Sequence, residues 1–186
     1  MSDLKYLFAY SIPLMTLVSI SYNGILTFAT PLYAFIFIPL LEIILKDYDI
    51  EYSESQKEKR LNNILFDILL YLNIPFVFGL LAYGFWVLET KSLLPFEMVG
   101  IVLSLGILLA TNAINVAHEL GHRKTKGEQT LSKLLLLPCL YMHFYLEHNF
   151  GHHKNVATPE DPATSKKNQS VYHFWITSVL KQYKNA

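Results

Sequence analysis

The chain has 186 residues, 52% of them hydrophobic and 16% charged, and its basic and acidic residues balance to a formal net charge of zero. That balance gives no electrostatic reason to expect nucleic-acid binding, which requires a basic face. The charged residues are unevenly spread, and three long segments contain none. This distribution indicates an integral membrane protein made of helices.

The first uncharged segment runs from Tyr6 to Leu41, which is too long for a single membrane span. It contains Asn23-Gly24, a turn signal, near its middle. Thr30-Pro31 follows, and Thr before Pro is typical of a helix start. We therefore predict a helical hairpin, with helices at about 5–22 and 31–46.

Two further uncharged segments, Ile68 to Leu88 and Met98 to Ala117, are each long enough for one helix across a hydrocarbon core of about 30 Å. They predict membrane spans at about 64–88 and 97–117. The fold class is thus an all-α membrane bundle of about four helices over residues 1–117. A histidine-rich helical region follows over residues 118–186, within a single truncated domain.

Four spans place the N-terminus, the loop at about 47–63 and everything after His118 on one side of the membrane. That side carries 14 of the 15 Lys and Arg residues, and only Lys91 lies on the other. Because positive residues accumulate on the cytoplasmic side, the histidine-rich region is predicted to be cytoplasmic. The loop itself carries both signs of charge, which is typical of a solvated connection.

All seven histidines lie between His118 and His173. His118 and His122 are four residues apart, as are His148 and His152, and this spacing on an α-helix places two imidazoles on one face, as two ligands of one metal require. His153 would lie about 100° further round the helix and reach a second ion. These five imidazoles exceed the needs of one tetrahedral zinc, and nitrogen ligands suit iron as well.

Several residues around these histidines are candidates for supporting roles. Asn115 shares the helix face of His118 and His122. Glu160 and Asp161 are the nearest downstream carboxylates, and they are expected either to accept hydrogen bonds from ligand histidines or to cap a turn. The apolar segment 131–146 is too short to span, so it is expected to bring His148 back towards His118. His143 and His173 are predicted to lie off the metal site.

HELGH is also a literal HExxH motif, in which two histidines bind zinc and the glutamate, here Glu119, activates water in a metalloprotease. At the end of an apolar helix, it resembles the site of intramembrane proteases. This alternative leaves HNFGHH without a role, and no Leu-Asp-Gly segment supplies a third ligand.

NVAHELGHRK, followed by HFYLEHNFGHHKNVATPEDPA, resembles the integral-membrane alkane 1-monooxygenases of the membrane fatty-acid desaturase/hydroxylase superfamily. The resemblance is loose over the four spans and specific over residues 115–175. A membrane fatty-acid desaturase is a further alternative, although the later boxes of desaturases are usually HxxHH.

The resemblance implies a non-haem enzyme with two iron ions that hydroxylates the terminal methyl group of n-alkanes, using O2 and electrons from rubredoxin and its reductase. It implies His118, His122, His148, His152 and His153 as iron ligands, with no other catalytic or cofactor-binding residue. Glu119 becomes an outer residue of the site instead of a protease base. The expected location is the bacterial inner membrane. Because such enzymes continue into further spans and a third histidine box, the chain is expected to be an inactive N-terminal fragment.

Overall fold

The computed structural model describes residues 2–45, 53–55, 60 and 63–186, and the side chains from residue 5 onward. Every regular element among these residues is helical, so the all-α prediction is confirmed. The chain divides into two compact units, Met1–Ala113 and Ile114–Ala186. The predicted division at 117/118 lies four residues further along the chain.

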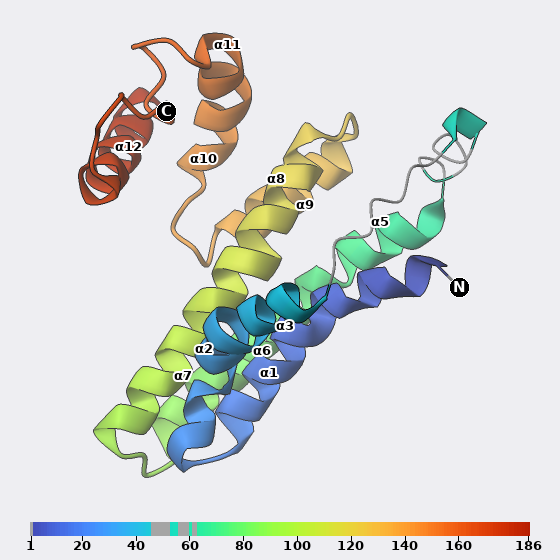
Figure 1. The fold of residues 1–186 in the computed structure, drawn as a ribbon, viewed down its shortest axis with the longest axis vertical. Helices are drawn as coiled ribbons and strands as arrows, with labels where there is room; N and C mark the ends of the chain where they lie inside the picture. The colour runs from blue at the N-terminus through green and yellow to red at the C-terminus, as the bar shows by residue number, and fades with distance from the viewer. Residues whose placement is uncertain (1, 46–52, 56–59, 61–62) are drawn as a thin grey trace. The chain divides into compact units, whose positions relative to one another are not determined.

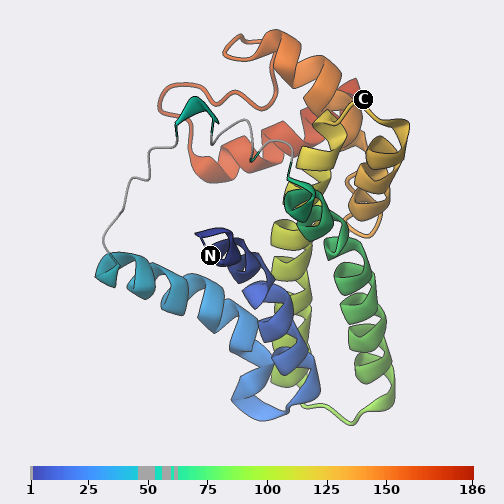
Figure 2. The same ribbon diagram turned by 90° about the vertical axis from the view of Figure 1, so that its right-hand side faces the viewer.

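The N-terminal hairpin of the first unit consists of two helical arms (Figure 2). The first arm comprises a 3-10 helix, Ser2–Tyr10, and α1, Ser11–Ser21. The second arm comprises a 3-10 turn, Gly24–Phe28; α2, Ala29–Leu32; a π turn, Tyr33–Phe37; and α3, Ile38–Ile44. Gly24 makes the turn between the arms with φ of +69°, a conformation that glycine adopts without strain.

The predicted helix start at Pro31 is wrong, because the second arm is already helical from Gly24. The reason lies in Thr30, whose backbone N–H donates to Oγ of Ser19 at 3.1 Å and whose hydroxyl lies 3.1 Å from the same oxygen. The Thr30 side chain therefore links the two arms of the hairpin instead of capping a new helix.

The next helices are α5, Ile64–Tyr71, and α6, Asn73–Thr90, separated at Leu72. Pro75 lacks the N–H that would bond to the carbonyl of Tyr71, which explains a break one turn before it. α7, Pro95–Leu108, continues through a π turn, Leu109–Ile114. The predicted loop at 47–63 lies mostly outside the described residues.

Three helices of the described residues are long and apolar enough to cross a membrane: Gly24–Ile44, Ile64–Thr90 and Pro95–His122. The first arm of the hairpin is not among them, so a fourth span at about 5–22 stays a prediction. Large apolar side chains point outward from these helices, with Phe35 72% and Ile43 81% exposed. Polar groups meet inside, where Nδ2 of Asn112 donates to Oδ1 of Asn73 at 2.9 Å. An apolar exterior around satisfied polar groups is typical of a membrane bundle.

The second unit begins with α8, Asn115–His122, and α9, Lys126–Leu136, which pack against each other (Figure 1). The Thr125 side chain caps α9 by accepting from the N–H of Glu128 at 3.2 Å. The remaining elements are α10, His143–Leu146; a π turn, Glu147–His152; α11, His153–Asn155; a looped segment; and α12, Val171–Asn185.

Candidate metal centre

The first histidine pair lies on α8, which projects both imidazoles from one face. Nε2 of His118 and Nε2 of His122 are 3.1 Å apart. The opposite face packs on α9, where Oγ of Ser132 donates to the carbonyl of Ala117 at 2.6 Å. Gly121 lies at this contact, and a Cβ there would be 3.2 Å from the Ser132 hydroxyl. The close α8–α9 contact therefore leaves the histidine face of α8 free.

The second histidine group lies on the π turn Glu147–His152 and the first residue of α11. An α-helical register was expected here, with His153 about 100° further round the helix, and that register is wrong. In a π turn the hydrogen bonds run from i to i+5, so residues five apart share a face. Nε2 of His153 accordingly lies 3.1 Å from Nε2 of His148.

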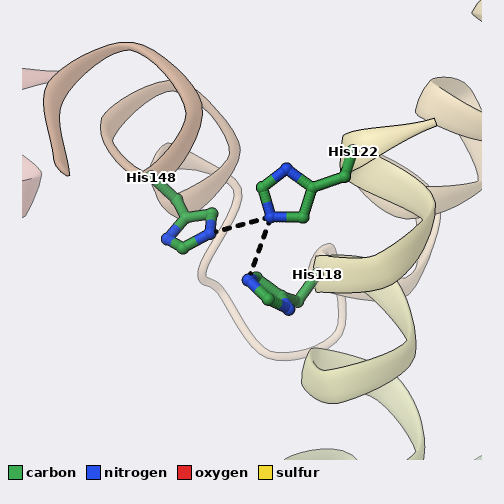
Figure 3. A group of neighbouring side chains, drawn as sticks. All are labelled: His118, His122 and His148. Carbon is green, nitrogen blue, oxygen red and sulfur yellow. Dashed lines mark hydrogen bonds between the residues drawn. The ribbon is translucent and has the colours of Figure 1, made fainter. Parts of the chain in front are cut away.

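The two groups meet at His148. Its Nε2 is 3.1 Å from Nε2 of His122, and its ring centroid is 4.4 Å from that of His118. The three imidazoles point toward one another (Figure 3) and offer ligand atoms that all lie within 4.8 Å of one another. Through His148 and His122, the Nε2 atoms of four histidines form a chain with 3.1 Å steps.

The 3.1 Å spacing fits nitrogen ligands of a transition metal. Two nitrogens that each lie about 2.0–2.1 Å from one ion are separated by about 2.8 to 3.4 Å, for angles between octahedral and tetrahedral. The donor set consists of imidazoles, which bind metals in the neutral form. Burial and the neighbouring imidazoles of His118, His153, His122 and His152 lower the pKa of His148 to about 4. His148 is therefore neutral, with a free lone pair, at physiological pH.

His152 differs from the other box histidines because its Nδ1 faces a carboxylate. Nδ1 lies 2.9 Å from Oδ2 of Asp161, which is only 3% exposed. Asp161 also accepts from the hydroxyl of Thr164 and, at 2.9 Å, from the N–H of Ala163. Burial raises the pKa of Asp161, but these hydrogen bonds outweigh it, so the pKa is lowered and the carboxylate stays ionised.

The other residues predicted to support the metal ligands are Asn115, Glu119 and Glu160. In the described part of the chain, none of them forms a hydrogen bond to a box histidine as Asp161 does. Asn115 and Glu160 are exposed. Oε1 of Glu119 accepts from Nε of Arg123 at 3.1 Å, on the surface of α8. His143 packs between Tyr141 and Tyr183, with centroid distances of 4.6 and 5.2 Å, and burial lowers its pKa.

Sequence reasoning missed Glu147, which directly precedes His148 and is only 6% exposed. Its carboxylate lies over Gly151, where a Cβ would be 2.6 Å from the carboxyl carbon. Nδ2 of Asn185, on α12, donates to Oε1 of Glu147 at 3.4 Å. In the sequence, the feature that could have indicated this close contact is the spacing of Glu147 and Gly151, a glycine one helical turn after a glutamate.

Membrane-spanning helices and a cluster of convergent imidazoles define an integral membrane protein with a histidine-box metal site as its candidate centre. The comparisons agree. The chain belongs to the fatty acid desaturase family, whose model matches residues 94–186, the half of the chain that includes both boxes.

Curated relatives confirm the resemblance to the alkane 1-monooxygenases. The chain is 36% identical over 149 residues to alkane 1-monooxygenase 1 of Alcanivorax borkumensis and, over the same length, 36% identical to alkane 1-monooxygenase of Pseudomonas putida. Each match covers 80% of this chain and 37% of the relative. Identity to the enzyme of Ectopseudomonas oleovorans is 40% over 112 residues, covering 60% of this chain and 28% of that one. The chain thus spans little more than a third of the curated relatives that it matches.

Proposed function

We propose that this chain carries part of the di-iron site of a non-haem monooxygenase that hydroxylates the terminal methyl group of n-alkanes. The observation that supports this most directly is the 3.1 Å contact between Nε2 of His122 in the first box and Nε2 of His148 in the second. Two boxes 26 residues apart contribute ligands to one place, as a metal shared between them requires. Relatives named alkane 1-monooxygenase supply the reaction class.

The proposed ligands are His118, His122, His148, His152 and His153. Iron with O2 supplies an oxidant strong enough to break a terminal C–H bond, which no protein side chain provides. The residues of this chain would bind the iron and orient its ligands. His148 presents a neutral Nε2, and Asp161 fixes the ring of His152 by accepting from its Nδ1–H. Electrons are proposed to come from rubredoxin and its reductase.

The membrane environment suits an alkane substrate. An n-alkane has no polar group and partitions into the hydrocarbon core, where the apolar spans of this chain also lie. We propose that the substrate reaches the metal site from the bilayer and not from water.

The experiment is metal analysis of the protein, expressed from its complete coding region and extracted from membranes. We expect iron, and we expect His148→Ala to lose most of it. His173→Ala is the matched control, because His173 lies on exposed α12 outside the cluster. Reduced membranes supplied with rubredoxin, its reductase and octane should form 1-octanol. One tightly held zinc that survives His148→Ala would contradict the proposal.

The HExxH protease is disfavoured by the same geometry. His148 from the second box joins the HELGH pair, and Glu119 forms an ion pair with Arg123 on the surface. A fatty-acid desaturase is chemically closer to the proposed monooxygenase than a protease is, because the same iron chemistry removes hydrogen from an acyl chain. It differs in substrate, so product analysis with octane and with a fatty acyl substrate separates the two activities.

We also propose that the histidine boxes face the cytoplasm from the bacterial inner membrane. The support is the cation distribution, with 14 of 15 Lys and Arg residues on one side of a four-span topology. Reporter fusions test it. A cytoplasmic reporter fused after Ala186 should be active, and a periplasmic one should be active at 91–94. The reverse pattern would overturn the orientation.

A further inference from the structure

α12 carries a broad apolar face that the second unit leaves largely exposed, although Tyr183 on this face contacts the ring of His143. At 100° per residue, the six side chains of this face fall within an arc of about 140° around the helix. They are Tyr172, Trp175, Ile176, Val179, Leu180 and Tyr183, and their exposed fractions range from 46% to 72%. We call these six residues the α12 apolar face.

The side by which α12 packs on its own unit is largely polar, with Phe174 as a half-buried apolar residue. Ser178 and Gln182 are the buried residues of the helix. Nε2 of Gln182 donates to Oγ of Ser178 at 2.7 Å, and the hydroxyl of Tyr141 donates to Oε1 of Gln182 at 3.1 Å. A helix on the surface of a water-soluble protein buries its apolar side and exposes its polar side. α12 has the opposite arrangement, so its outer environment is not bulk water.

We propose that α12 lies in the plane of the membrane interface, with its apolar face inserted among the lipid acyl chains. The same chain contains helices that are long and apolar enough to span a membrane, so a bilayer is part of its environment. α12 has a polar side that includes Ser178, Gln182 and Lys181, which does not suit a helix that crosses the hydrocarbon core. An in-plane position is the one that buries its apolar face. This inference goes beyond the proposed function and does not depend on it.

The composition of the face favours lipid over a covering protein. Tyr172, Trp175 and Tyr183 each carry one polar atom at the far end of an apolar ring, the residue types that concentrate at membrane interfaces. A protein partner would have to supply a hydrogen-bond partner for each, whereas headgroups and interfacial water do so without special design. Lys184 lies just outside the apolar arc, where its side chain can reach the headgroups.

Tryptophan fluorescence tests the proposal directly, because the chain has two tryptophans, Trp86 and Trp175. Trp86→Phe leaves Trp175 as the single reporter in the full chain, reconstituted in phosphatidylcholine vesicles. We expect strong quenching by lipids brominated near the upper end of the acyl chain and weaker quenching by deeply brominated lipids. Aqueous iodide should quench Trp175 several-fold less than it quenches a tryptophan on the polar side of the helix.

The matched control carries Trp86→Phe and Trp175→Phe together with Lys181→Trp. Position 181 lies on the opposite side of α12 from the apolar face, so its tryptophan should respond to iodide and little to brominated lipid. Equal iodide quenching of Trp175 and of the control tryptophan would overturn the proposal, because it would place the apolar face in water. Quenching of Trp175 by neither agent would also overturn it, because it would show that protein covers the face.

Discussion

Oδ2 of Asp161 accepts a hydrogen bond from Nδ1 of His152 at 2.9 Å, although Asp161 lies nine positions further along the chain. The proton on Nδ1 fixes the tautomer in which Nε2 of His152 has a free lone pair. Asp161 is itself held by Thr164 and Ala163, so the carboxylate has a defined position before any metal binds. Such outer hydrogen bonds typically change metal affinity by 10- to 100-fold when they are removed.

Asp161→Ala should therefore weaken iron binding by about 10- to 100-fold. Asp161→Asn should have a smaller effect, because its amide oxygen still accepts from His152. Chelator competition on detergent-extracted protein measures the affinity. Glu160→Ala is the control, since Glu160 is the exposed neighbouring carboxylate. Equal losses for Glu160→Ala and Asp161→Ala would show a general effect of charge and not an oriented histidine.

The first histidine box was predictable because α8 is a regular helix. His118 and His122 follow the i, i+4 rule, and their Nε2 atoms meet at 3.1 Å. The residues of the second box were also named from their spacing, but their register was not predictable, because the π turn at Glu147–His152 brings His153 to His148. Within this π turn Glu147 is buried, and its carboxylate lies against Gly151. Periodicity in the sequence does not report such packing.

The hairpin shows a similar limit. The uncharged segment and Asn23-Gly24 correctly indicated two arms with a turn between them, because charge and glycine act locally. Thr30-Pro31 was misread as a helix start, because the partner of Thr30 is Ser19, eleven residues earlier on the facing arm. Rules for helix caps state that a threonine can cap the helix that follows it. They do not include a hydrogen-bond partner elsewhere in the chain, such as Ser19.

The lowered pKa of His148 predicts a pH dependence for the metal-free protein. Burial disfavours the protonated form, so the folded chain takes up this proton only near pH 4, while an unfolded histidine takes it up near 6.5. The unfolded state therefore binds more protons in this window, and the free energy of unfolding should fall as the pH falls through it. Thermal unfolding of chelator-treated protein in detergent measures the trend. His148→Gln should flatten it, and an unchanged slope in this variant would contradict the assignment.

Gly100 on α7 predicts a local packing requirement in the first unit. A Cβ at this position would lie 2.8 Å from Cβ of Thr27 and 2.8 Å from the ring of Phe28. Gly100→Ala should therefore destabilise the protein by about 1–3 kcal/mol, as overpacking typically does. Gly106→Ala, on the same helix, is the control because nothing lies within 4 Å of its Cβ. Thermal unfolding in detergent compares the two, and equal destabilisation would show that helix contact at Gly100 is not the cause.

Substitution of Glu119 should distinguish a monooxygenase from a HExxH hydrolase most clearly. In a hydrolase this carboxylate activates the metal-bound water, so its loss abolishes activity while the metal remains. Here Oε1 of Glu119 accepts from Arg123 at 3.1 Å, and the Glu119 side chain is 52% exposed. Such a surface ion pair contributes about 0.5 kcal/mol or less.

Glu119→Gln should thus leave both iron content and 1-octanol formation within about twofold of the unmodified protein, whereas His122→Ala should lose iron and activity together. Metal analysis and product formation on the same membrane preparations provide the comparison. A Glu119→Gln protein that keeps its metal but loses all activity would give the glutamate the role it has in a protease and would refute the function proposed here.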